Sequence, residues 1–131
     1  MADELPTPTG RETDILKVLW QLGPSSVRDV HDALNADAVE PIAFNTVQTV
    51  LRVMEGKQLV SHRAEGRAFI YLPRFSREET AARFLDRVFD GAASELMLSL
   101  IRAERVTADE LDRMHQMIDQ ARNGRRRGGR K

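Results

Sequence analysis

The chain has 131 residues, of which 41% are hydrophobic and 31% are charged, with 20 basic residues balanced by 20 acidic ones. This length allows one modest domain or two very small ones. The absence of cysteine excludes structural disulfides and thiolate metal sites and leaves the redox compartment open. The chain does not begin like a signal peptide and has no apolar run of membrane-spanning length, so we expect a cytoplasmic protein.

Charge is unevenly distributed along the chain although the formal total is zero. Residues 1–41 carry −5, residues 42–74 carry +3, residues 76–121 carry −4 and residues 122–131 carry +6. Two positive segments are therefore available to a polyanion, and nucleic acid is the natural partner.

The first two helices are predicted from capping boxes, in which a side-chain hydroxyl and an acid three residues later satisfy free backbone amides. Thr9 and Glu12 open a helix that runs to about residue 22. Ser26 and Asp29 open a second helix that runs to about residue 34. With a third helix at 44–57, they predict a three-helix core.

The helix at 44–57 is predicted to have two opposed faces. One is an apolar stripe with the period of a helix, formed by Val47, Val50, Leu51 and Met54. The opposite face consists of uncharged hydrogen-bonding side chains and one cation: Asn45, Thr46, Gln48, Thr49 and Arg52. These side chains suit the base edges of a DNA major groove. The alternative is an ordinary solvated helix face.

A β-hairpin is predicted after this helix. Strands at 59–63 and 68–72 are joined through residues 64–67, where Gly66 can supply a positive φ. We expect the basic side chains in and beside this hairpin to contact DNA phosphates, which fixes register without reading bases: Lys57, His62, Arg63 and Arg67. The alternative is a solvated hairpin tip.

The second half of the chain predicts three more helices. Capping boxes at Ser76 and at Thr107 open helices that run to about residues 90 and 121, and residues 94–104 form a helix that is apolar nearly all round. Such a helix must be buried, and the same helices of a second subunit would bury it in an isologous dimer. The alternative is a monomer with a compact helical subdomain. The expected interface comprises Phe84, Leu85, Val88, Leu96, Met97, Leu98, Leu100, Ile101, Leu111, Met114 and Ile118.

The predicted fold is therefore mainly α with a small β wing. A flexible amino terminus (1–8) precedes a winged-helix DNA-binding domain (9–74), a helical dimerisation domain (75–121) and a disordered basic tail (122–131). Two roles remain open for the tail: it adds nonspecific affinity for DNA, or it keeps the protein soluble.

Nothing in the sequence favours catalysis. His31, His62 and His115 fall in three different predicted elements without the i, i+4 pairing of a helical metal site, and there is no phosphate-cradling glycine loop. We expect no enzyme activity, no metal and no cofactor. The rival to a DNA-binding protein is a winged-helix module that binds protein, because Glu55 and Glu65 would repel phosphate. Salt dependence separates the two, since phosphate contacts release counterions and binding to duplex DNA must weaken steeply as salt rises.

The three predicted carboxyl-terminal helices are preceded by the segments TDILKVLWQLGPSSVRDVHDAL and FNTVQTVLRVMEGKQLVSHRAEGRAFIYLPRFSREE. In wording and order, these elements resemble the penicillinase repressor family of bacterial transcriptional regulators. The resemblance covers roughly residues 9–121. It implies an amino-terminal winged helix, a helical dimerisation domain, and repression of a promoter through an inverted repeat.

The resemblance also implies how such repressors are released from DNA. In β-lactam-responsive members a membrane-embedded zinc metallopeptidase senses the drug and the repressor is cut in its dimerisation domain, typically between Asn and Phe. The matching bond is Ser99–Leu100, so cleavage here requires a peptidase of different preference. The paired cysteines of the copper-responsive branch are absent. Relatives usually have Lys-Gly after the recognition helix, and the order Gly56-Lys57 predicts a slightly shorter helix here.

Overall fold

The computed structural model describes the backbone of residues 8–128 and the side chains as far as residue 125. The chain divides into two compact units, Met1–Ala81 and Ala82–Lys131. The flexibility expected for residues 1–8 falls, apart from Pro8, outside the described residues. Within the part that is described, no helix combines the length and the apolar character needed to cross a membrane.

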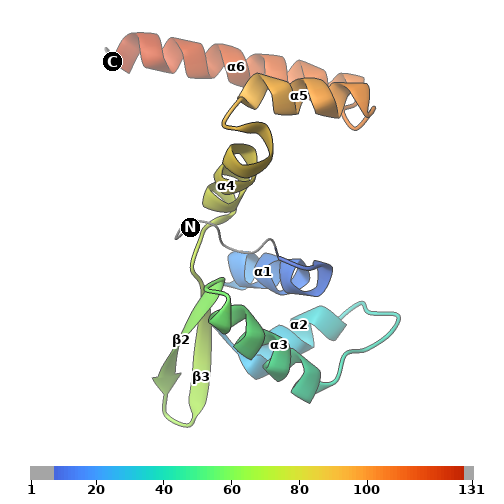
Figure 1. The fold of residues 1–131 in the computed structure, drawn as a ribbon, viewed down its shortest axis with the longest axis vertical. Coiled ribbons are helices and arrows are strands. Elements are labelled where there is room, and N and C mark those ends of the chain that lie inside the picture. The colour runs from blue at the N-terminus through green and yellow to red at the C-terminus, as the bar shows by residue number, and fades with distance from the viewer. Residues whose placement is uncertain (1–7, 129–131) are drawn as a thin grey trace. The chain divides into compact units, whose positions relative to one another are not determined.

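The first unit comprises the helices and strands that precede residue 74, together with the start of the helix that begins at Arg77 (Figure 1). In chain order they are α1 (Gly10–Leu22), β1 (Ser25–Ser26), α2 (Val27–Asn35), α3 (Phe44–Gly56), β2 (Val60–Glu65) and β3 (Ala68–Pro73). Both predicted capping boxes are present, at Thr9 with Glu12 and at Ser26 with Asp29. The predicted three-helix core and hairpin are thus confirmed.

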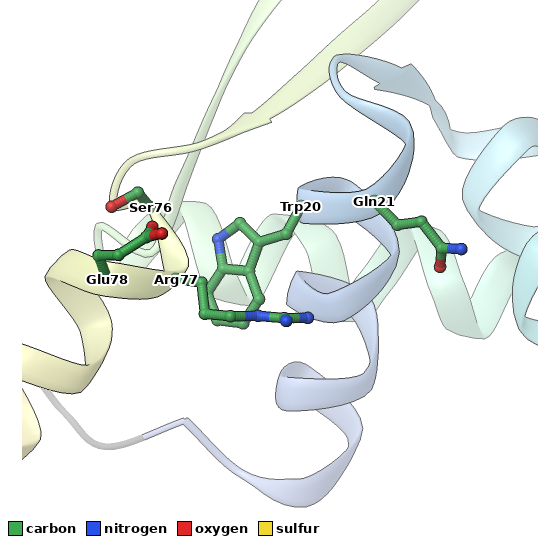
Figure 2. Close-up of a pocket in the computed structure, with 5 residues that line it drawn as sticks. All are labelled: Trp20, Gln21, Ser76, Arg77 and Glu78. Carbon is green, nitrogen blue, oxygen red and sulfur yellow. The ribbon is translucent and has the colours of Figure 1, made fainter. Parts of the chain in front are cut away.

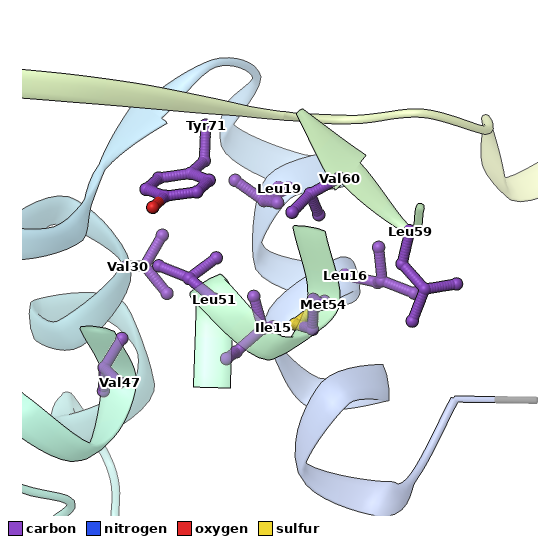
Figure 3. Close-up of a cluster of buried hydrophobic side chains, with 10 residues drawn as sticks. All are labelled: Ile15, Leu16, Leu19, Val30, Val47, Leu51, Met54, Leu59, Val60 and Tyr71. Carbon is purple, nitrogen blue, oxygen red and sulfur yellow. The ribbon is translucent and has the colours of Figure 1, made fainter. Parts of the chain in front are cut away.

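The core of this unit lies between the three helices and the sheet (Figure 3). Its buried side chains are Ile15, Leu16, Leu19, Val30, Val47, Leu51, Met54, Leu59, Val60 and Tyr71. The predicted apolar stripe of α3 supplies three of them, and Val50 packs against the cluster while remaining partly exposed. Because this stripe faces the core, the polar face of α3 is directed to solvent.

A short strand that the sequence does not predict completes the sheet. β1 pairs antiparallel with β3 through Ser25 opposite Tyr71 and Ser26 opposite Ile70, so the strand order is β1-β3-β2. Ser25 is buried, and its hydroxyl donates to the Gly23 carbonyl oxygen over 2.8 Å. Two residues cannot show the alternation that identifies a strand, so this pairing has no sequence signal.

The hairpin turn is tighter than predicted. β2 extends to Glu65, which pairs with Ala68, so the loop is the dipeptide Gly66-Arg67 rather than residues 64–67. Gly66 has φ of 61°. A positive φ at the first loop position alone is typical of a type II′ turn, whose twist matches that of the strands. Arg67 therefore lies at the tip of the wing formed by β2 and β3.

The carboxyl end of α3 has its glycine in an unusual place. The helix ends at Gly56, but the left-handed residue that closes it is Gln58, with φ of 66°. The Leu59 amide donates back to the Met54 carbonyl oxygen over 2.9 Å. This closure normally has glycine in the left-handed position, where a side chain costs about 1 kcal/mol.

Placing glycine at position 58 and removing it from position 56 is expected to stabilise the protein. Gln58→Gly removes the left-handed strain, and Gly56→Ala favours the helix, with nothing within 4 Å of the added methyl group. We expect each change to raise the free energy of unfolding by about 0.5–1 kcal/mol in urea titrations. Gly66→Ala is the contrasting control, because Gly66 also has a positive φ and its replacement should reduce stability.

The second unit contains the remainder of α4 (Arg77–Phe89), together with α5 (Ala93–Arg102) and α6 (Ala108–Gly128). The predicted capping boxes are present, with Ser76 bonded to Glu79 and Thr107 to Glu110. Of the side chains described between residues 82 and 125, none is buried. The apolar helix predicted at 94–104 is therefore not covered within one chain.

The basic tail is more ordered than the sequence predicts. The composition predicts disorder from residue 122, but α6 continues as far as Gly128. Arginine favours helix, and extending an existing helix needs no new nucleation. Residues 129–131 lie outside the described part of the chain.

Candidate nucleic-acid interface

The polar face of α3 is open to solvent. Asn45, Thr46, Thr49 and Arg52 are exposed, and Gln48 is partly exposed. Within residues described by the structure, none of these five side chains forms a hydrogen bond or an ion pair. Donors and acceptors on one helix face are thus left available to an external partner. Their predicted role in reading bases stays a prediction.

The two arginines of the wing differ in their surroundings. Arg63 forms an ion pair with Glu65 on the same strand, with Nη2 and Oε2 2.9 Å apart. Arg67, at the turn, is exposed and has no ion pair with any residue that the structure describes. Of these two arginines, Arg67 is thus the one whose charge is not compensated by a described carboxylate.

His62 links the wing to α3. Its Nδ1 lies 2.7 Å from Oε2 of Glu55 on α3, and its ring stacks on Phe69 with centroids 4.3 Å apart. It also lies 5.5 Å from the ring of Tyr71. These contacts give His62 a positioning role that the sequence does not suggest, because Glu55 belongs to another element. Its phosphate contact stays a prediction.

Tyr71 lies beneath this link and remains a neutral phenol. Burial raises its pKa above the usual value of 10, and the charge of Glu55 raises it further against the opposing effect of Arg52. The charges of two α3 residues, Glu55 and Arg52, thus act on a buried ring of β3.

Lys57 is also engaged within the fold. Its Nζ lies 2.8 Å from Oε2 of Glu12, a carboxylate on α1 that is only 3% exposed. Burial by itself raises the pKa of Glu12, but hydrogen bonds from Lys57 and from the Thr9 amide outweigh it and leave the pKa below 4.5. Lys57 thus ties the carboxyl end of α3 to α1. Its predicted phosphate contact stays a prediction.

We expect Lys57→Met to destabilise the first unit by about 1–3 kcal/mol at pH 7, because the buried carboxylate is deprived of its charged partner. The ion pair stabilises the fold fully above the unfolded pKa of Glu12 and progressively less as pH falls through the lower folded pKa. The difference from the wild type in urea unfolding should therefore shrink below about pH 4.5. Lys17→Met, at an exposed position of α1, is the matched control; a constant difference at all pH values would contradict this account.

Trp20 holds the start of α4 against α1 (Figure 2). Its Nε1 donates to the Phe75 carbonyl oxygen over 2.9 Å, and the Arg77 guanidinium lies 5.6 Å from the indole ring. A shallow pocket lined by Trp20, Gln21, Ser76, Arg77 and Glu78 lies at this contact. These contacts join the first turn of α4 to α1 within the first unit, which extends to Ala81. The predicted domain boundary at residue 74 stays a prediction.

The predicted interface side chains of the second unit are open or partly open. Phe84, Val88, Leu98, Leu100, Ile101, Leu111 and Ile118 are exposed, while Leu85, Leu96, Met97 and Met114 are partly exposed. Met117, which lies outside the predicted set, is more exposed than any of these at 59%. Ser99 and Leu100, the candidate cleavage bond, are both exposed within α5.

The histidines do not form a common site. His31 contacts Asp32 and the ring of Phe44, and His115 pairs with Asp119 on α6. Among the described residues, no group of three His, Asp or Glu side chains could hold a metal ion.

Three helices, a short sheet and a projecting hairpin, with a polar outward face on the third helix, define a winged-helix protein. A model of the penicillinase repressor family matches residues 8–120. The chain therefore belongs to the penicillinase repressor family, whose members are transcriptional repressors and not enzymes.

Individual relatives agree with this family. The chain is 23% identical to the penicillinase repressor of Bacillus licheniformis over 92% of its own length and 95% of that protein. It is 33% identical to the transcriptional regulator BlaI of Mycobacterium tuberculosis over 82% of its own length and 79% of the relative.

Two solved structures are also similar. The solution structure of monomeric Bacillus licheniformis BlaI in complex with the blaP half-operator has a TM-score of 0.49 and 25% identity, covering 58% of this chain and 90% of that one. A MarR family protein from Bacillus stearothermophilus has a TM-score of 0.47 and 17% identity, covering 87% and 77%.

Proposed function

We propose that the protein is a cytoplasmic, homodimeric transcriptional repressor that places α3 in the major groove of an inverted-repeat operator. The observation that carries this proposal is the outward face of α3, where five hydrogen-bonding side chains have no partner in the described part of the chain. Arg and Asn or Gln can form paired hydrogen bonds with guanine and adenine, and a threonine methyl can contact thymine. The exposed Arg67 at the wing tip supplies a phosphate contact beside the groove.

The dimer is supported by the second unit. Its described side chains include large apolar ones that are 38–59% exposed, and none is buried. An isolated set of helices with so little buried apolar surface would be unstable, whereas a second copy could cover these side chains. A two-fold axis would then present two α3 helices to two half-sites of opposite orientation.

Binding to DNA tests the proposal directly. A labelled inverted-repeat duplex from the protein's own promoter region is compared with a scrambled duplex at two salt concentrations, and the stoichiometry is determined. We expect preferential binding by two chains, weakening steeply with salt as counterions are released. Equal binding to both duplexes would contradict operator recognition at that promoter, and no duplex binding would favour a protein-binding module.

Arg67→Ala is expected to weaken binding to all duplexes by a similar factor and to lower the salt slope by about one, because one fewer phosphate is neutralised. The slope of log affinity against log salt measures this. Arg63→Ala should have a smaller effect, since Arg63 is already paired with Glu65. An unchanged slope for Arg67→Ala would mean that the wing does not contact DNA.

A membrane sensor metallopeptidase that cuts Ser99–Leu100 is the partner that we propose for release from DNA. Both residues are exposed, although their bond lies inside α5, which must unwind for cleavage. A cut there would divide the apolar helix of the proposed dimer. Coexpression with a candidate peptidase, followed by sequencing of the fragments, tests this step; a cut elsewhere would reject the bond, and an intact chain would reject that partner.

A further inference from the structure

Arg28 occupies an unexplained position at the start of α2. It is the second residue of that helix, and its guanidinium carbon lies 5.4 Å from the ring centroid of Phe44, the first residue of α3. Arg28 is exposed and has no carboxylate partner among the residues that the structure describes. Its contact with Phe44 therefore places a free positive charge beside the amino end of α3.

The charge of Arg28 does not stabilise α2. The amino end of a helix is the positive end of its dipole, so a cation there is unfavourable. The acid of this first turn, Asp29, already accepts a hydrogen bond from the Ser26 amide. What holds the guanidinium is the face of Phe44, through a cation–π contact that orients the arginine without neutralising its charge.

The wing lies at the other end of α3. Glu55, one residue before α3 ends at Gly56, contacts His62 of β2. The two contacts thus lie at opposite ends of α3: Arg28 lies at Phe44, its first residue, and the wing contacts Glu55 in its last turn. A major groove is about 12 Å wide and is bordered by one phosphate backbone on each side.

We propose that Arg28 is a second phosphate anchor, contacting the DNA backbone on the side of the groove opposite to the wing, with Phe44 as its positioning residue. This rests on the proposed placement of α3 in the major groove. The two anchors would hold α3 from both strands and so set its register for base reading.

Arg11 provides a matched control. It is also the second residue of its helix, follows the equivalent capping box at Thr9, and is exposed without a carboxylate partner in the described part of the chain. It differs from Arg28 in lying on α1. The next residue of α1, Glu12, pairs with Lys57 at the carboxyl end of α3 and not at its amino end. The two arginines thus match in chemistry and helix position but not in their relation to the amino end of α3.

The test measures operator and scrambled-duplex binding over a salt series. Arg28→Ala should reduce affinity about tenfold on both duplexes and lower the salt slope by about one, while Arg11→Ala changes neither. Phe44→Leu, with folding checked by circular dichroism, should reduce affinity about threefold with the slope retained, because the charge remains but is no longer oriented. Phosphate ethylation interference should locate the two anchors. Arg28→Ala should abolish interference at a phosphate of one strand, and Arg67→Ala should abolish it at a phosphate of the other strand.

Equal reductions for Arg28→Ala and Arg11→Ala would overturn the proposal, since they would reflect general charge alone. Interference abolished on the same strand by both variants would overturn the assignment to opposite backbones. An affinity that Arg28→Ala leaves unchanged would reject Arg28 while leaving the repressor function standing. A wild-type protein that binds no duplex would reject both.

Discussion

Leu98→Glu should convert the protein from a dimer to a monomer. Leu98 is 39% exposed on α5 within a unit that buries none of its described side chains, so we place it in the interface between two copies. A glutamate there would bring an unpaired charge into an apolar contact. Sedimentation analysis should show one chain, and operator affinity should fall by about 10²–10⁴-fold because the two half-sites are no longer bound together.

Ser99→Glu is the matched control for this change. Ser99 is the next residue of α5 and is exposed, and it lies on the polar side of the helix with Glu95 and Arg102. The same added charge should leave the dimer intact there. If Leu98→Glu remains dimeric and folded by circular dichroism, the interface must lie elsewhere on the protein.

Arg52→Ala should reduce affinity for the operator by about 1–3 kcal/mol and leave binding to scrambled DNA nearly unchanged. Arg52 is exposed on the outward face of α3 and forms no ion pair with a described residue, so its guanidinium is available for a two-hydrogen-bond contact with guanine. The measurement is the ratio of affinities for the two duplexes at fixed salt.

Arg52→Lys distinguishes base reading from simple charge. Lysine retains the positive charge but lacks the planar fork that forms paired hydrogen bonds. The ratio of operator affinity to scrambled-duplex affinity should therefore fall in both Arg52→Ala and Arg52→Lys. The slope of log affinity against log salt should be retained in Arg52→Lys, because the charge is retained. An equal reduction of affinity on both duplexes in Arg52→Ala would remove its base-reading role.

The contacts that most affect these predictions join residues of different helices and strands. Glu12 and Lys57 are 45 positions apart, and His62 is held by Glu55 on a different element. Phe44 likewise belongs to a different helix from Arg28, the arginine that it orients. No local periodicity connects such pairs, so the sequence groups Lys57 and His62 with the wing cations by charge alone and does not identify Arg28.

The sequence by itself determined the helices and the two faces of α3. Capping boxes act over three residues, and an apolar stripe follows directly from the helical period, so both can be recognised in the sequence. The same local signals failed at β1, whose two residues pair only because β3 lies beside them, and at residues 122–128, where helix propagates from α6. Only the tertiary structure decided which charged groups are paired within the fold. Because α1 and the wing pack against α3, Glu12 pairs with Lys57 and Glu55 pairs with His62. Arg28, Arg52 and Arg67 have no carboxylate partner among the described residues.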